Sequence, residues 1–314
     1  MLFRTLLITG LSFACALVSA AQELPDAMAI MKKVAANTAS ATEARRQYIY
    51  HQRVRASLLQ GNGQIVCRES RDYTVIPQEA TTEKQLTAFS GECREGRKMV
   101  PYARVNADDD RKAHGADGGR AEMSGVIDEL ADDRKSRDGI PRQLFPLGPG
   151  EVEHYRFSLK GQTTVKGRRA YDLTFEPAAR RGVCIDAGDE KSGTAVHVDL
   201  HGESDDAKTA ECRPWKGEVW IDAEDYQPIR IDTQLYKGVP WGVRVFMGIN
   251  IRNLGFSLTY DRVAPGVWFP ATYGTEFRIV VFWGYKRTIT LSMENTGFQK
   301  TDAQSTIRFE PLEK

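Results

Sequence analysis

The sequence predicts a mainly β (α+β) protein, built on one large, curled antiparallel sheet with a few covering helices. Residues 215–233 encode a hairpin, because Val219 and Ile221, and then Ile229 and Ile231, alternate with polar residues on either side of a turn. The same period of two recurs along most of the remaining chain. It yields roughly eleven or twelve strands, which is too many for a flat open sheet and predicts a curled one.

Composition supports a folded protein and argues against one class of partner. The 314 residues are 41% hydrophobic and 27% charged, which is typical of a folded chain rather than a disordered one. The formal net charge at pH 7 is +1. General nucleic-acid binding needs a basic surface, so this balance argues against it.

The first 20 residues have the pattern of a secretory signal peptide. Arg4 precedes an apolar run over residues 6–18, and residues 18–20 (Val-Ser-Ala) fit a cleavage site between small residues. The run is shorter than the roughly 20 residues that span a bilayer, although an uncleaved anchor is the alternative. We expect a periplasmic or secreted protein in which residues 21–314 form a single domain, with insertions near 103–140 and 178–213.

Cysteine usage fits an exported protein. Removal of the signal peptide would leave Cys67, Cys93, Cys184 and Cys212, an even number that suggests disulfides. Three pairings are open, and the sequential one (67–93 and 184–212) closes two loops of similar size. A four-cysteine zinc site is disfavoured because no Cys-x-x-Cys pair occurs.

The N-terminal half predicts two helices and several strands. Asp26 caps a helix from residue 25 to about 36, and the small polar residues 37–42 predict its end. Strands are expected over 47–59 and 64–76 with a glycine-containing turn between them, and a short strand over 85–93. A second helix is expected over 122–134. Residues 144–150, rich in proline and glycine, form a hinge or a lid.

Two segments lack the period of a strand. Residues 106–120 contain an acidic cluster, but no register fits a twelve-residue calcium loop, so we interpret them as a solvated loop. Residues 178–212 look like an insertion closed by two cysteines. Around them, strands are expected near 155–159, 165 and 171–177, and then over 242–261, 267–282, 283–294 and 306–310.

One cluster has the residues of a metal site. His197, Asp199 and His201 would point to one side of a strand and could bind zinc with an open position for a hydrolytic water. The alternative is the solvated face of a surface hairpin, because the intervening residues are apolar. Nucleophile elbows, phosphate loops and dinucleotide fingerprints are missing from the sequence. Glu224 and Asp225 fill a turn, so a structural role is expected for them.

Aromatic residues crowd the C-terminal third and are the candidate ligand-lining set. They alternate with aliphatic residues in segments apolar enough for both strand faces to leave water, so one face could line a cavity. The alternative is that they pack the core. The candidates are Trp241, Phe246, Phe256, Phe269, Phe277 and Phe282.

Two stretches carry a family resemblance. Residues 167–177, Gly-Arg-Arg-Ala-Tyr-Asp-Leu-Thr-Phe-Glu-Pro, and residues 217–231, which begin Gly-Glu-Val-Trp-Ile-Asp-Ala-Glu-Asp-Tyr, resemble the outer-membrane lipoprotein-sorting (LolA/RseB-like) superfamily. The resemblance covers roughly residues 22–312. It implies an incomplete β-barrel covered by helices, whose apolar interior binds acyl chains or senses lipoproteins. The matching motifs carry no catalytic residues.

These observations lead to a binding function rather than an enzymatic one. We expect a cell-envelope protein, without a cofactor, that holds lipid or lipoprotein acyl chains in the concave face of its sheet. An envelope sensor or interaction protein with a filled core is the alternative, with a protein partner in place of the lipid. A zinc hydrolase using His197, Asp199 and His201 is the third hypothesis.

Overall fold

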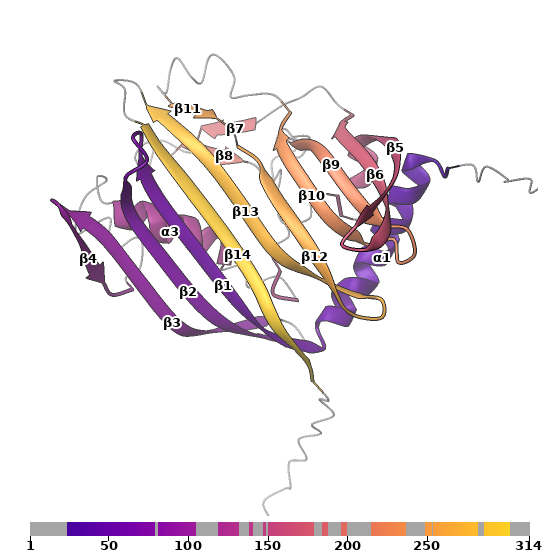
Figure 1. Cartoon of the computed structure of the whole chain (residues 1–314), viewed down its shortest axis with the longest axis horizontal. Helices are drawn as coiled ribbons and strands as arrows, with labels where there is room; N and C mark the ends of the chain where they lie inside the picture. Colours follow the sequence, from indigo (N-terminus) through magenta and orange to yellow (C-terminus); the bar gives the residue numbers. More distant parts are fainter. Residues whose placement is uncertain are drawn as a thin grey trace, which may run out of the picture.

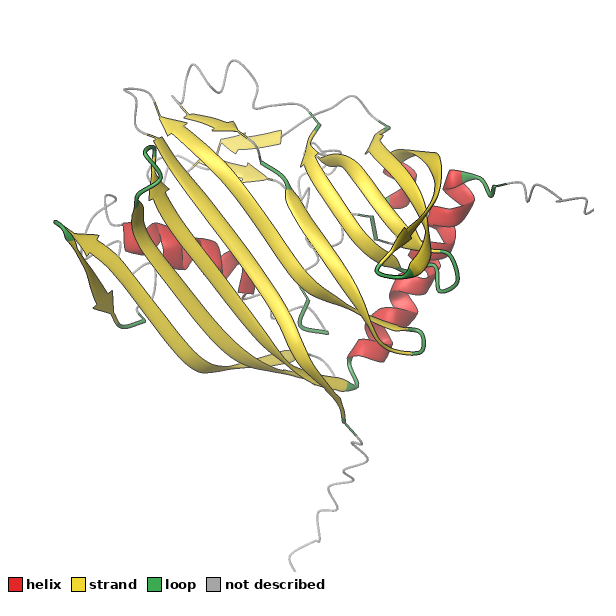
Figure 2. Cartoon of the chain, in the orientation of Figure 1, coloured by secondary structure: helices red, strands yellow, loops and turns green. Residues whose placement is uncertain are grey.

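The computed structural model describes residues 24–78, 81–104, 119–131, 138–140, 147–148, 150–178, 184–187, 196–199, 215–236, 249–252, 254–281 and 286–301. Within these ranges the protein is one curled antiparallel sheet with two α-helices behind it (Figures 1 and 2). The predicted mainly β, curled-sheet fold is therefore confirmed. Among the helices of the described residues, none has the length and apolarity needed to cross a membrane.

The large sheet has 12 strands in the order β4-β3-β2-β1-β14-β13-β12-β10-β9-β6-β5, with β11 paired to β13. Strands β7 (Cys184–Ala187) and β8 (Val196–Asp199) form a separate small sheet. The bounds of the other strands are β1 (Tyr48–Gln60), β2 (Ile65–Pro77), β3 (Thr82–Glu95), β4 (Lys98–Tyr102), β5 (Tyr155–Val165), β6 (Arg168–Pro177), β9 (Trp215–Asp222), β10 (Pro228–Leu235), β11 (Ile249–Arg252), β12 (Phe256–Ala264), β13 (Val267–Val281) and β14 (Lys286–Lys300).

Alternation along each strand separates the two faces of the sheet. In β1, Tyr50, Val54 and Leu58 are buried, whereas Arg53 and Arg55 between them are exposed. The buried positions face the helices, and we call this side the inner face. The outer face carries exposed cross-strand ion pairs such as Arg53 with Asp72 (2.6 Å), which contribute little stability in water but keep this face solvated.

Helix α1 (Ala27–Arg45) is longer than predicted. Asp26 caps it as expected, with Oδ2 accepting from the backbone N–H of Ala29 at 3.0 Å. The predicted end at residue 36 is wrong, because the small polar residues stay helical. The Thr38 hydroxyl donates to the carbonyl of Val34 four residues earlier, and the Asn37 amide donates to the backbone oxygen of Asp225 in the β9–β10 turn. Tertiary contacts thus override a local break signal.

Three further predictions of extent differ from the structure. The strand expected over 85–93 is the 14-residue β3; half of its residues are exposed, and no apolar alternation marks its ends in the sequence. The strand expected over 242–261 corresponds to β11 and β12, with residues 237–248 and 253 outside the description. The second helix, α3 (Gly119–Ala131), begins earlier than expected. The strand predicted at 306–310 lies outside the described residues.

The hairpin of β9 and β10 is tied to the rest of the fold through its turn. The Asp222 carboxylate accepts hydrogen bonds from the backbone N–H groups of Glu224 (3.0 Å) and Asp225 (2.8 Å) and is paired with Arg168. Asp225 in turn accepts from the indole N–H of Trp268 at 2.9 Å. The acidic turn residues therefore have the structural role predicted for them, joining β6, β9 and β13.

Candidate functional site

One row of side chains crosses the inner face from β2 to β5. Cross-strand pairing places its members opposite one another, so all of them point to the same side. All are buried or partly buried, and every one except Arg71 is apolar or aromatic. This central row consists of Arg71, Val54, Met293, Tyr273, Leu258, Ile231, Val219, Leu173 and Leu159.

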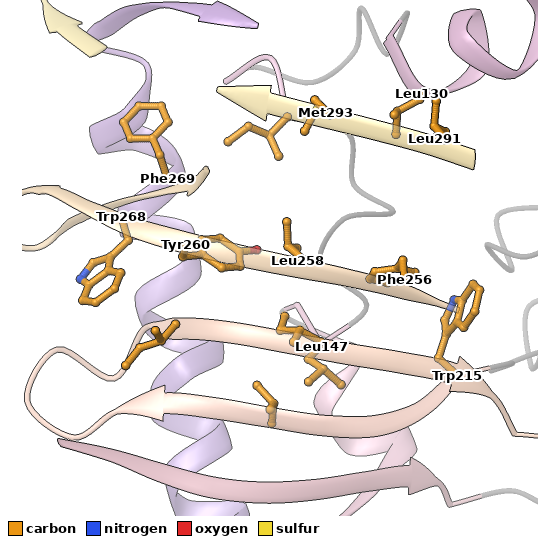
Figure 3. Close-up of a cluster of buried hydrophobic side chains, with 14 of the residues drawn as sticks. Leu130, Leu147, Trp215, Phe256, Leu258, Tyr260, Trp268, Phe269, Leu291 and Met293 are labelled. Atoms are coloured by element: carbon orange, nitrogen blue, oxygen red, sulfur yellow. The ribbon is translucent and has the colours of Figure 1, made fainter. Parts of the chain in front are cut away.

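The two helices cover different parts of this face. Helix α3 packs against β1 and β2, and α1 packs against β13 and β5 (Figure 1). Leu147 has none of its surface exposed and belongs to the same buried core as Leu258 and Phe256 of β12, with which it is labelled in Figure 3. An apolar layer therefore runs between the sheet and the segments that cover it.

A pocket of about 440 Å³ opens where this layer reaches the β5 edge of the sheet. Tyr155 and Phe157 of β5, Phe175 of β6 and Met28 of α1 contribute its apolar lining, together with polar residues of the same two strands. Phe157 lies directly opposite Phe175, with ring centroids 6.5 Å apart. The volume falls in the range of small-ligand sites, and aromatic residues with a few polar groups are typical linings.

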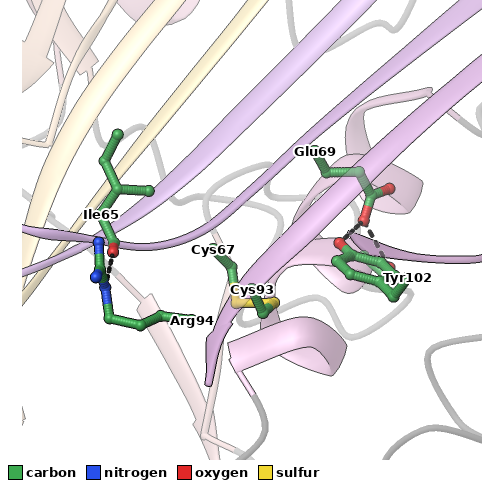
Figure 4. Close-up of a disulfide and its surroundings, with 7 residues drawn as sticks. Ile65, Cys67, Glu69, Cys93, Arg94 and Tyr102 are labelled. Atoms are coloured by element: carbon green, nitrogen blue, oxygen red, sulfur yellow. Dashed lines mark hydrogen bonds between the residues drawn. A yellow bond between two sulfur atoms is a disulfide. The ribbon is translucent and has the colours of Figure 1, made fainter. Parts of the chain in front are cut away.

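Polar groups gather under α3 at the opposite part of the sheet. Glu69 and Arg71 on β2 are both buried, and the Arg71 Nε donates to Glu69 at 2.5 Å. Tyr102 of β4 donates its hydroxyl to the same carboxylate at 2.6 Å (Figure 4), and Ser124 of α3 does so at 3.0 Å. Asp128 of α3 is paired with the Arg71 guanidinium. We call these five residues the Arg71 cluster.

The disulfide between Cys67 and Cys93 lies beside this cluster and joins β2 to β3 (Figure 4). It is one of the two bridges of the sequential pairing. The side chains of Cys184 and Cys212 lie outside the described residues, so the second bridge stays a prediction.

Three of the six sequence-predicted lining residues are described, and they lie in β12 and β13. Phe256 is buried against Trp215, with ring centroids 5.1 Å apart (Figure 3). Phe277 is partly buried and lies opposite Ile289 of β14. Phe269 is fully buried farther along β13, 5.5 Å from the Tyr48 ring, so it packs the core there. Trp241, Phe246 and Phe282 lie outside the described residues, and ligand contact by any of the six stays a prediction.

The proposed zinc ligands are described only in part. His197 and Asp199 belong to β8, where the backbone register places them opposite Asp186 and Cys184 of β7; their side chains and all of His201 lie outside the description. Among the residues whose side chains are described, no group of three histidine, cysteine or carboxylate residues could hold a metal.

Sequence reasoning missed the polar residues of the inner face. Gln52, Glu69, Arg71 and Asn295 are each 1–2% exposed, although polar residues in an alternating strand normally point to water. The sequence held a signal for their burial. Because side chains alternate along a strand, Glu69 and Arg71 of β2 point to the same face as Cys67 and Val75, which are buried.

Comparison with known proteins finds similarity of fold. No protein-family model and no curated protein matches the chain. A DUF1329 family protein from Desulfovibrio piger matches with 11% identity and a TM-score of 0.34, over 92% of this chain and 98% of the other. A LolA superfamily protein from Nitrosomonas europaea matches with 10% identity and a TM-score of 0.32, over 91% and 99%.

A domain named for outer membrane lipoprotein sorting, from Vibrio parahaemolyticus, matches with 13% identity and a TM-score of 0.29, over 88% of this chain and 95% of that domain. These solved structures, at identities of 10–13% and TM-scores of 0.29–0.34, are what the chain is similar to.

Proposed function

We propose that this protein is an exported, non-enzymatic cell-envelope protein that binds an acyl chain of a lipid or lipoprotein along the inner face of its sheet. The observation that carries the proposal is the central row, which is apolar from Val54 in β1 to Leu159 in β5 and ends beside the edge pocket. A long, narrow apolar layer suits a long, narrow apolar ligand.

The energetics favour such a ligand. Burying one methylene group contributes about 0.8 kcal/mol, so a chain of about a dozen methylenes gains roughly 10 kcal/mol before the entropic costs of association. Among the described strands, the outer face offers no comparable surface, because its exposed side chains include ion pairs such as Lys160 with Glu218 at 2.5 Å. The acyl chain therefore has one suitable face.

The edge pocket supports an entry route. Phe157 and Met28 are only partly buried there, so apolar surface meets solvent at the end of an otherwise covered layer. Strand β5 pairs with β6 on one side and ends the sheet order on the other. An acyl chain that enters here would pass the ion pair of Arg156 with Glu176 (2.7 Å) at the pocket and then lie along the inner face.

The test begins with the protein purified from its own envelope fraction. We expect native mass spectrometry, followed by organic extraction, to reveal acyl-containing ligands, and a fluorescent acyl probe to bind the extracted protein with saturation. Protein that carries no acyl ligand and shows no saturable probe binding would contradict the proposal and favour a filled core.

A pair of variants locates the site. Phe157→Glu places a carboxylate in the edge pocket and should weaken probe binding at least tenfold, because a charge there opposes apolar burial. Thr164→Glu adds the same charge to an exposed position of the same strand, opposite Arg169, and should bind the probe as the wild type does. Equal binding by both variants would exclude the β5 pocket as the entry.

A further inference from the structure

Apolar and charged side chains share the pocket at the β5 edge. Tyr155, Phe157 and Phe175 reach it from the inner face of the β5–β6 hairpin. Arg156 and Glu176 alternate with these residues along the same two strands, so they reach the pocket from the outer face. One space of about 440 Å³ is therefore in contact with an aromatic surface on one side and with two charges on the other.

The two charges form an ion pair that a ligand can open. Arg156 and Glu176 lie directly opposite each other on β5 and β6, and the Arg156 Nη2 donates to the Glu176 carboxylate at 2.7 Å. Their side chains are 54% and 47% exposed, so water already competes for both groups. Because an exposed pair of this kind contributes little to stability, its separation costs the fold little. The opened pair offers a ligand one cation and one anion side by side.

The adjacent hydroxyl residues divide the pocket into a donor side and an acceptor side. Ser158 follows Arg156 on the same face of β5, so its hydroxyl can donate to an anion that Arg156 binds. Thr174 precedes Glu176 on the same face of β6, and its hydroxyl donates to the backbone oxygen of Ser158 at 3.4 Å. The Thr174 oxygen is left as an acceptor beside the Glu176 carboxylate. Donors thus line β5, and acceptors line β6.

Charge complementarity restricts the head group of a lipid bound here. A head group with a negative charge alone is attracted by Arg156 but repelled by Glu176, and a purely positive one meets the opposite combination. An uncharged head group leaves the ion pair closed and gains nothing from it. A head group with one negative and one positive charge satisfies both side chains, and it forms two charge-assisted contacts in place of the one it breaks.

We propose that the edge pocket recognises a zwitterionic phospholipid, whose phosphate binds Arg156 and Ser158 of β5 and whose ammonium group binds Glu176 of β6. This assignment rests on the proposed function, and it adds the class of head group that accompanies the acyl chain. The head group stays at the rim of the sheet in contact with water. The acyl chain passes over Phe157 and Phe175 into the apolar layer of the inner face.

The experiment compares competitors of the fluorescent acyl probe that carry the same two octanoyl chains, so that their apolar contributions cancel. Dioctanoyl phosphatidylethanolamine has both charges, dioctanoyl phosphatidylglycerol has the negative one alone, and dioctanoylglycerol has neither. Wild-type protein should release the probe at concentrations of phosphatidylethanolamine at least about fivefold lower than of either other lipid, because only this lipid pairs with both side chains.

Two substitutions separate the contributions of the charges. Glu176→Gln removes the partner of the ammonium group, so phosphatidylethanolamine should lose its advantage over phosphatidylglycerol. Arg156→Gln removes the partner of the phosphate, so phosphatidylethanolamine should lose its advantage over dioctanoylglycerol. Arg53→Gln and Asp72→Asn are the matched controls, because they alter an exposed cross-strand ion pair of the same kind (2.6 Å) on β1 and β2, and they should leave both preferences at their wild-type values.

The outcomes that would overturn the head-group assignment differ from those that would refute acyl binding. Equal displacement by the three lipids in the wild type, or an unchanged preference in either pocket variant, would overturn the assignment. So would equal or tighter binding of a dioctanoylglyceryl-cysteine lipopeptide blocked at both ends, because it has the same chains without charge and represents a lipoprotein. If the probe itself does not bind the wild type, the proposed function is refuted and the head-group assignment falls with it.

Discussion

Replacement of Asp222 by alanine should destabilise the protein by about 3 kcal/mol. The Asp222 carboxylate is fully buried and accepts two backbone hydrogen bonds in the turn and two from Arg168. The two backbone donors lie in a partly exposed turn, so each contributes about 0.5–1.5 kcal/mol. The charged bonds to Arg168 add about 1.5–3 kcal/mol, reduced because Arg168 keeps Glu224 as a partner.

Urea unfolding at pH 7, followed by tryptophan fluorescence, measures this loss as a lower transition midpoint with an unchanged slope. Asp222→Asn is the matched variant, because its amide oxygen still accepts from the turn while the charge is lost; about half the effect is expected. Arg168→Gln should lose a similar amount from the other partner. If Asp222→Ala unfolds within 0.5 kcal/mol of wild type, the turn does not anchor the hairpin as described.

Three further predictions concern pH, a buried ion pair and the disulfide. Burial opposes ionisation of Asp222, but the hydrogen bonds from Arg168 and the turn lower the pKa of its carboxyl group below the unfolded pKa of about 4. The ionised carboxylate therefore stabilises the fold fully above about pH 4, and this stabilisation is lost as the pH falls further. The difference in unfolding free energy between wild type and Asp222→Asn should close in acid, and a constant difference would contradict this. Arg45→Met removes the guanidinium that lies 2.6 Å from the buried carboxylate of Asp138, and should cost about 3 kcal/mol in urea unfolding because the carboxylate charge loses its cation. Adding Asp138→Leu should recover most of this loss, and no recovery would show that charge is not the cause. Removal of the Cys67–Cys93 bridge by alanine at both positions frees a loop of 26 residues and should cost about 3.5 kcal/mol, measured against wild type without reductant; an unchanged midpoint would mean that the unfolded chain is not constrained by the bridge.

Elements marked by local chemistry were predictable. The Asp26 cap, the β1–β2 hairpin and the β9–β10 hairpin follow from capping, turn residues and a period of two, which act within a few residues. The end of α1 was not predictable in this way. Its last turns are supported by hydrogen bonds to the β9–β10 turn, nearly two hundred residues away along the chain, and no local signal records them.

The site was predictable in kind but not in detail. The aromatic strands of the C-terminal third indicated an apolar face, and Phe256 and Phe277 lie on it. The Arg71 cluster was not predicted, although the alternation of β2 places Glu69 and Arg71 on the same face as Cys67 and Val75. Its members come from β2, β4 and α3, and their meeting depends on strand register and on where the second helix docks.

The pairing of β1 with β14 has a consequence for how the molecule is made. Tyr48 faces Lys300 at the start of this ladder, so the first and last strands are neighbours in the interior of the sheet. Neither half can seal its open side until nearly all of the polypeptide is available, and contacts so distant in sequence form slowly. A chain that ends before residue 286 lacks β14, so β1 and β13 are each left as an unpaired edge of a separate half-sheet.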